Sequence, residues 1–464
     1  MSTLKKKLIG DRKFYGMALR VAIPIILQNG ITNVVNMLDN IMVGRVGTEP
    51  MSGVAIVNQL MFVFNICIFG AISGAGIFTA QFWGCDKQEG VRHTFRFKWL
   101  ISLLIGIIGV LLFVFRGEDL ALLYLHGEEN QVELLMTLDY AKQYIFVIIF
   151  SMIPFAIEQV YTSTLRECGE TVLPMKAGMV AVFVNLVLNY LLIFGHFGFP
   201  KLGVVGAATA TVIARWIEAI IVIVWTHVHK EKNPYIVGIY KSFYIPANLV
   251  KKILVKGTPL MLNECFWSLG MASLTQCYSY RGLDAVAALN ICTTIGNVFN
   301  VVYISMGSAV AIIVGQLLGA GKMEEAKDTD TKLIAFSVML CLGIGTALGL
   351  TAPLFPQVYN TSNEVRSLAT DLIRILALVM PMHAFLHSAY FTLRSGGKTM
   401  ITFLFDSVFM WVASIPLAFV LSRYTSIPMA PMYFVIQAIE IVKCIIGFVL
   451  LKKGVWLQNI VVEE

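Results

Sequence analysis

Long apolar runs follow one another along the whole chain, separated by polar stretches. A helix that crosses a bilayer needs about 20 mostly apolar residues, and the runs are long enough to predict twelve such spans. The predicted spans are roughly residues 17–42, 53–80, 97–115, 137–162, 172–195, 203–228, 249–279, 284–317, 331–356, 365–393, 398–423 and 429–451. The predicted fold class is therefore an all-α integral membrane protein.

The composition agrees with this prediction. Hydrophobic residues make up 57% of the chain and charged residues 14%, whereas a soluble domain carries about 25% charge. The 8 cysteines form no CxxC pair and no metal-ligand spacing, so we interpret them as small buried hydrophobic residues rather than as a disulfide framework. The N-terminal stretch shows no cleavable signal peptide.

The net charge of +7 follows the positive-inside rule and needs no nucleic-acid partner. Lysine and arginine concentrate in the even-numbered connections, such as the one with Arg92 and Arg96, and at the chain ends, with Lys5 to Lys7 and Lys452. The odd-numbered connections are short or acidic, as at Glu118. We therefore expect a multi-pass protein of the plasma membrane with both termini in the cytoplasm.

The two halves of the chain repeat one another. One constant offset in residue number pairs Pro24 with Pro259, Gln81 with Gln316 and Gly84 with Gly319. A slightly smaller offset pairs Thr164-Leu165-Arg166 with Thr392-Leu393-Arg394. An even number of spans in each half gives parallel repeats, which predicts two pseudo-symmetric six-helix lobes, residues 1–235 and 236–464, with a site near the membrane midplane.

The first span carries a carboxylate, Asp39, together with Asn33, Asn36 and Met37. A charge in a span costs about 3 kcal/mol, so such a residue usually faces a protein interior or a water-filled cavity. The alternative is that Asp39 reaches the membrane interface or caps its helix.

Further oxygen-bearing side chains in the first half fit a cation site. Asn185 and Asn189 in the fifth span are four residues apart and share one helix face, and Thr209 and Thr211 follow in the sixth. Together with Asp39, this set of oxygen ligands suits a monovalent cation or a proton. Asparagine and threonine also bridge packed membrane helices, so a structural role stays open.

In the second half, Glu264 of the seventh span is the main candidate. It lies beside Phe266 and Trp267, and an acid flanked by aromatic rings can bind an organic cation. The competing interpretation is an ion pair with a basic residue such as Arg281 or Lys256.

Two histidines in the tenth span, His383 and His387, have the i, i+4 spacing of a metal site but no third ligand nearby in the sequence. A role in proton or substrate binding, or hydrogen bonding within the bundle, is the better interpretation. Further charges in or near spans, which the interface can accommodate, are Glu158, Glu218, Asp406 and Glu440.

Taken together, these features resemble the multidrug and toxic compound extrusion (MATE) family. The resemblance covers essentially the whole chain. It rests on twelve spans in two lobes, the early prolines of spans one and seven, the acids in NMLDNIMVGRVG and GTPLMLNE, the twin TLRECGET and TLRSGGKT segments, and the Gln-x-x-Gly ends of spans two and eight.

The resemblance implies the MATE fold and a secondary antiporter, not an enzyme. Such a protein exports amphipathic, usually cationic organic compounds (drugs or toxins) in exchange for Na⁺ or H⁺ by alternating access, with no further cofactor and as a monomer. Asp39 would be the cation or proton site of the first lobe, completed by Asn185 and Asn189, with Thr209 and Asn36 as further candidates. The substrate candidates are Glu264, His383, Met37, Asn33 and Trp267.

The sequence departs from the family pattern at two positions. Asn189 stands where some members carry aspartate, and His383 stands near the place where some NorM-like members carry an aspartate in span ten. A second-lobe sodium site built on those acids therefore does not carry over intact.

Three other functions were weighed. A flippase for a lipid-linked saccharide would need a basic cavity for pyrophosphate, whereas the candidates here are acids. A membrane metalloenzyme would need a third metal ligand, and a channel would not need two repeated lobes.

Overall fold

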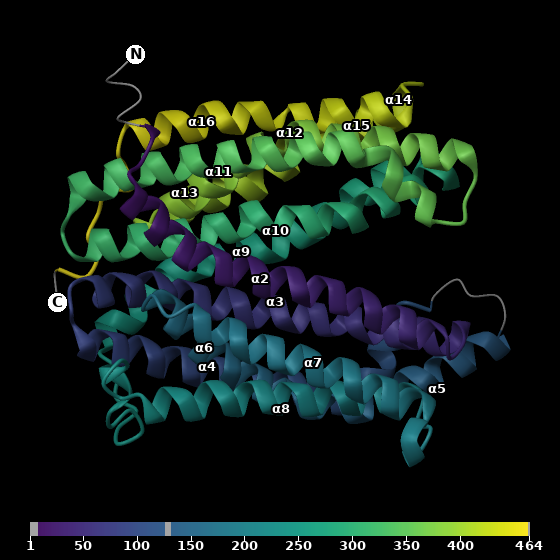
Figure 1. The fold of residues 1–464 in the computed structure, drawn as a ribbon, viewed down its shortest axis with the longest axis horizontal. Coiled ribbons are helices and arrows are strands. Elements are labelled where there is room, and N and C mark those ends of the chain that lie inside the picture. Colours follow the sequence, from purple (N-terminus) through teal and green to yellow (C-terminus); the bar gives the residue numbers. More distant parts are fainter. Residues whose placement is uncertain (1–7, 126–130, 463–464) are drawn as a thin grey trace. The chain divides into compact units, whose positions relative to one another are not determined.

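The computed structural model describes residues 8–125 and 131–462, which fold almost entirely into long helices (Figure 1). Lys5 to Lys7 lie outside the described residues. The helices of the first half are α2 (Arg12–Gly44), α3 (Thr48–Gly84), α4 (Gln88–Leu122), α5 (Gln131–Ile148), η1 (Ile149–Ser151), α6 (Met152–Glu167), α7 (Val172–Phe194), η2 (His196–Gly198), α8 (Val204–Val228) and η3 (Pro234–Ile236). Those of the second half are α9 (Ala247–Ser279), α10 (Leu283–Gly319), α11 (Met323–Thr351), η4 (Ala352–Val358), α12 (Asn363–Ser395), α13 (Thr399–Phe403), η5 (Leu404–Val408), η6 (Met410–Ser414), α14 (Ile415–Tyr424), α15 (Met429–Ala438) and α16 (Glu440–Lys452).

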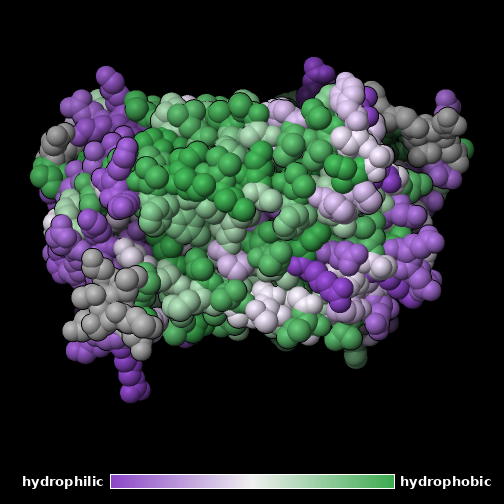
Figure 2. Space-filling view, turned by 90° about the horizontal axis from the view of Figure 1, so that it is seen from above, coloured by the Kyte–Doolittle hydropathy of each residue, from purple (hydrophilic) through white to green (hydrophobic). Residues whose placement is uncertain are grey.

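The predicted membrane-spanning architecture is confirmed. Within the described residues, 11 helical segments are long and apolar enough to cross a membrane. Helix α9 is not among these 11 segments. With 33 residues it is long enough to cross a membrane, but Lys251, Lys252, Lys256 and Glu264 lower its hydropathy. Figure 2 shows hydrophobic side chains across the middle of one face of the molecule and hydrophilic ones toward its ends, as expected for a surface in contact with lipid.

The internal repeat extends to the ends of the helices. Helices α2 and α9 both have 33 residues, and the offset from Arg12 to Ala247 equals the offset from Pro24 to Pro259. Helices α3 and α10 both have 37 residues and begin at the same offset. Helices α4 and α11 also begin at this offset but have 35 and 29 residues. Two stretches of unlike sequence therefore encode the same order of helices.

The chain packs into two compact units. One contains residues 27–79 and 88–253, and its core joins side chains of α3, α5, α6 and α8 around Val57, Ile148 and Ala208. The other contains the chain up to Ile26, residues 80–87 and the chain from Leu254 onward. The lobes predicted from the repeat, residues 1–235 and 236–464, remain a prediction.

The end of α3, within the second of these units, crosses α10 at the twin Gln-x-x-Gly segments. A β-carbon on Gly84 would overlap the carbonyl of Gln316, and one on Gly319 would overlap the carbonyl of Gln81. The two glycines therefore allow the backbones to touch where any side chain would separate them.

A C-terminal segment, residues 454–461, is fastened to this crossing. The side-chain amide of Gln81 donates to the carbonyl of Gln458 at 3.2 Å, and its oxygen accepts from the backbone N–H of Ile460 at 2.8 Å. Asn459 donates to the carbonyl of Gly319 at 2.8 Å, and Trp456 is almost fully buried. One glutamine of the repeated motif thus anchors the tail.

Gly84→Ala is expected to lower the melting temperature of the purified protein, because overpacking a tight contact costs about 1 to 3 kcal/mol. The matched control is Gly343→Ala in α11, where a new β-carbon meets no atom within 4 Å. The control should melt at or slightly above the wild-type temperature, since alanine is the better helix former. Equal melting of the two variants in detergent would contradict the close crossing.

Candidate functional site

Asp39 on α2 lies at the centre of a polar cluster in the unit that contains α4 to α8. Its Oδ1 accepts a hydrogen bond from Asn189 Nδ2 at 2.7 Å, and the same nitrogen lies 3.1 Å from Asn185 Oδ1. The Asn185 amide also contacts Thr211 Oγ1 at 3.2 Å. With this amide turned over, its nitrogen lies 2.9 Å from Asp39 Oδ2, and its oxygen accepts from Thr211. Polar side chains of α7 and α8 thus form one cluster with the carboxylate of α2.

The cluster opens into a small cavity of about 80 Å³. A water molecule occupies about 30 Å³ of liquid volume, so the space suits a partly hydrated small ion, whereas pockets for drug-sized molecules measure about 300 Å³ or more. The side-chain oxygen of Asn189 is buried and has no hydrogen-bond donor. Asn189 does not line the cavity, whereas Asp39, Asn36, Asn185 and Thr211 do, and these side chains offer the oxygen ligands that suit a cation.

A second charged group lines the same cavity. Arg215 on α8 donates to Glu218 at 2.8 Å, and Glu218 is 5% exposed. A β-carbon on Gly178 would lie 2.9 Å from Gln28 Nε2 and 3.3 Å from Glu218, so a larger residue there would displace the end of the Gln28 side chain. Sequence analysis did not single out Arg215, although its i, i+3 spacing to Glu218 was a usable signal.

The other candidates of the first half divide into two groups. Asn36 lines the cavity, and so does Thr211. Thr209 is absent from the lining and donates to the carbonyl of Val205 one turn earlier, at 2.7 Å. Asn33 is half-buried, and the side chain of Met37 is 44% exposed.

The candidates of the second half lie in the other compact unit. Glu264 on α9 is half-buried, and neighbouring Trp267 is 38% exposed. Arg281, one of the partners considered for Glu264, donates instead to the carbonyls of Leu421 and Thr425, at 2.6 and 2.9 Å.

The two histidines of α12 pack against one aromatic ring. His383 Nε2 lies 3.2 Å from Gln437 Oε1, and the rings of His383 and His387 lie 6.0 and 4.8 Å from that of Tyr303, centroid to centroid. Within residues 8–125 and 131–462, no group of three or more histidine, cysteine, aspartate or glutamate side chains is placed to hold a metal ion.

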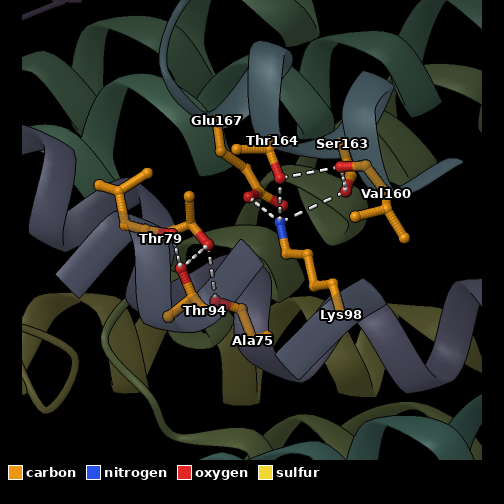
Figure 3. A network of polar contacts seen from close by, with 9 residues as sticks. Ala75, Thr79, Thr94, Lys98, Val160, Ser163, Thr164 and Glu167 are labelled. Carbon is orange, nitrogen blue, oxygen red and sulfur yellow. Dashed lines mark hydrogen bonds and ion pairs between the residues drawn. The ribbon is translucent and has the colours of Figure 1, made fainter. Parts of the chain in front are cut away.

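A separate ion pair lies between α4 and α6 (Figure 3). The ammonium of Lys98 is fully buried and forms a short ion pair with Glu167, at the end of the TLRE segment. It also donates to Ser163 and Thr164, at 3.3 and 3.2 Å. Gly76 accommodates the carboxylate, since a β-carbon there would collide with Glu167. Figure 3 shows these polar contacts linking α4 to α6, which indicates a structural role.

Repeated membrane helices around a small polar cavity define a class of protein, the membrane transporters, rather than an enzyme. The MatE family model matches residues 24–191 and 259–420, and the chain belongs to this family. This confirms the resemblance deduced from the repeated motifs.

Curated relatives cover most of the chain. It is similar to "Probable multidrug resistance protein NorM" of Thermotoga maritima (24% identity, 88% of this chain and 85% of the relative) and to "Probable multidrug resistance protein YoeA" of Bacillus subtilis (25%, 87% and 86%).

Solved structures confirm the fold. The chain is similar to an outward-facing multidrug resistance MATE family transporter of the MOP superfamily (TM-score 0.84, 19% identity, 97% of this chain and 98% of that one). It is also similar to a MOP superfamily transporter from Pyrococcus furiosus (TM-score 0.83, 20% identity, 98% of each chain). The predicted MATE fold is therefore confirmed.

Lys98→Met is expected to lower the melting temperature strongly, because it removes a fully buried ammonium that pairs with Glu167, and breaking such a buried pair costs about 3 to 5 kcal/mol. The double variant Lys98→Met/Glu167→Gln should recover most of the loss. Lys142→Met serves as the control, because Lys142 and Glu118 form an ion pair whose side chains are 49% and 50% exposed and should change stability little. Thermal melts in detergent measure all three, and a double variant as unstable as Lys98→Met would contradict this role.

Proposed function

We propose that this protein is a secondary antiporter that exports amphipathic, cationic organic compounds in exchange for Na⁺ or H⁺ by alternating access. The proposal rests on membership of a transporter family, on relatives named as multidrug resistance proteins, and on the cavity at Asp39. The cavity is the observation that carries the ion-coupled part.

The coupling ion binds at Asp39 in this proposal. A negative carboxylate, the Asn36 and Asn185 amide oxygens and the Thr211 hydroxyl line the cavity and offer oxygen ligands, which suit a hard cation such as Na⁺. A proton on the carboxylate would satisfy the same charge. The cavity is too small for the organic substrate, so ion and substrate occupy different spaces.

Helix α2 is the element through which ion binding acts. Its residues up to Ile26 pack in one compact unit and those from Leu27 in the other, and Pro24 lies within the helix next to this division. Proline removes a backbone hydrogen bond, which makes a helix easier to bend. An ion at Asp39 therefore shifts the equilibrium between the two conformations of the transporter, because it binds more tightly to one shape of α2 than to the other.

The substrate would be held by Glu264 and the exposed aromatic ring of Trp267, which together attract organic cations through charge and cation–π contact. His383, Met37 and Asn33 are further candidates for its binding surface. A lipid-linked saccharide has less support, because these candidates offer no cluster of basic residues for a pyrophosphate. The protein would act as a monomer in the plasma membrane with both termini in the cytoplasm.

Asp39→Asn is expected to reduce gradient-driven efflux of ethidium from proteoliposomes to the level of empty liposomes, because the amide carries no charge for the ion. Imposing a Na⁺ or a H⁺ gradient separately identifies the coupling ion. The control Asp119→Asn alters a carboxylate that is 60% exposed and pairs with Arg116, and should transport normally. Normal efflux by well-folded Asp39→Asn protein would refute the proposed ion site.

The two threonines of α8 provide a finer test. Thr211→Val is expected to weaken the apparent affinity for the coupling ion about tenfold, because it removes a polar ligand worth about 1 to 1.5 kcal/mol. Thr209→Val should leave the affinity unchanged, since Thr209 does not line the cavity. Both hydroxyls donate to carbonyls of their own helix, at Val205 and Ala207, but only that of Thr211 lies at the cavity. The ion dependence of efflux measures both, and equal effects of the two substitutions would contradict the assignment.

A further inference from the structure

A buried lysine lies in the second half of the chain, away from the Asp39 cavity. Lys443 on α16 is 5% exposed, and its ammonium lies 3.2 Å from Asp406 Oδ1 and 2.8 Å from Glu440 Oε2. It also lies over the rings of Phe405 and Phe409, at 5.6 and 5.8 Å from their centroids. Two carboxylates and two aromatic faces thus surround one cation.

The carboxylate of Asp406 is fixed from its other side. Asn263 Nδ2 donates to Asp406 Oδ2 at 3.1 Å, and Ser407 donates to Asn263 Oδ1 at 2.7 Å. Asp406 lies in the π-helical turn η5, a rare irregularity that is frequent at functional sites. Asn263 directly precedes Glu264, so this cluster adjoins the candidate substrate acid.

The cluster offers carboxylate and amide oxygens, as the Asp39 site does, but the ammonium of Lys443 lies among them. At Asp39, the amide oxygen of Asn189 lacks a donor, and the nearby Arg215 is bonded to Glu218. In the second-half cluster, no side-chain atom of Asp406, Glu440 or Asn263 is among the buried polar atoms that lack a partner in the described part of the chain. The ammonium of Lys443 fills the place that a mobile cation would need.

Lys443 pairs with both acids of the cluster, Asp406 and Glu440, and compensates one of their two negative charges. His387 is within electrostatic range of Asp406. The nearby acid Glu264 has Arg394 within electrostatic range.

We propose that the Lys443 ammonium is a built-in cation that occupies the second-half polar cluster, so that this half binds no coupling ion and the antiporter exchanges a single ion, the one at Asp39. This deepens the proposed function and rests on it. Lys443 therefore acts as a residue that sets the ion stoichiometry, since a tethered cation is always present whereas a dissolved one must be bound from solution.

The test measures ion binding by thermal melting of the purified full-length protein, with NaCl titrated against choline chloride at constant ionic strength and pH 8. A ligand that binds only the folded state raises the melting temperature with its concentration. Asp39→Asn protein is expected to show no rise with Na⁺. A rise that disappears when Asp406→Asn is added would overturn the proposal, because a mobile cation would then bind beside Lys443.

Removing the tethered charge should create a cation site. In the Asp39→Asn background, Lys443→Gln is expected to acquire a Na⁺-dependent rise in melting temperature, and Lys443→Arg, which keeps the positive charge, is not. A folded Lys443→Gln variant without any Na⁺ response would overturn the proposal. If Lys443→Gln does not fold, Lys443→Met is the second variant, and the result with Asp39→Asn alone remains decisive.

Failure of the proposed function gives a different result. Thermal melts measure ion binding and do not depend on transport. A protein that shows the predicted melts but no gradient-driven efflux would refute the antiporter, and the conclusion that the protein has a single ion site would still hold. A protein that transports but binds Na⁺ at Asp406 would refute only the role of Lys443.

Discussion

The cost of placing ionised groups among apolar helices is the constraint on which this structure depends. A buried ion loses several kcal/mol of hydration, and only an opposite charge or several hydrogen bonds can offset that loss. Lys98 has Glu167, and Lys443 has Asp406 and Glu440. The Lys98–Glu167 and Lys443–Asp406 pairs join different helical segments and so help to fix their packing, whereas Glu440 lies one turn before Lys443 in α16.

Asp39 differs from these closed pairs. Its carboxylate is held by side-chain amides rather than by a directly paired basic side chain, and it borders a small cavity. In the proposed antiporter, a cation in this space balances the negative charge of the Asp39 carboxylate. Because α2 contributes to both compact units, the proposed ion binding at Asp39 would act on a helix that the two units share.

Much of the fold follows from the sequence, because membrane spans need long apolar runs and the repeat shows itself in identical spacing. The offset that pairs Pro24 with Pro259 also relates the ends of α2 and α9. The span predicted at residues 249–279 corresponds to α9, although Lys251 and Lys252 lower the hydropathy of this helix.

The site was only partly predictable. Spacing placed Asn185 and Asn189 on one face, and the structure brings both to Asp39. Thr209 and Thr211 are two residues apart, which puts them on nearly opposite sides of a helix, and only the packing decides which side faces the cavity. The partnership of Lys443 with Asp406 joins α16 to the η5 turn, a tertiary contact that no local pattern encodes.

The most direct test of ion exchange at Asp39 is to count the ions that are released when a cationic dye binds to the purified wild-type protein. Dye binding is followed by fluorescence, while a Na⁺-selective electrode and a pH indicator in weak buffer record the ions. A single ion site at Asp39 predicts the release of one Na⁺ or one H⁺ for each dye molecule bound. Dye binding without any release of Na⁺ or H⁺ would contradict exchange at Asp39.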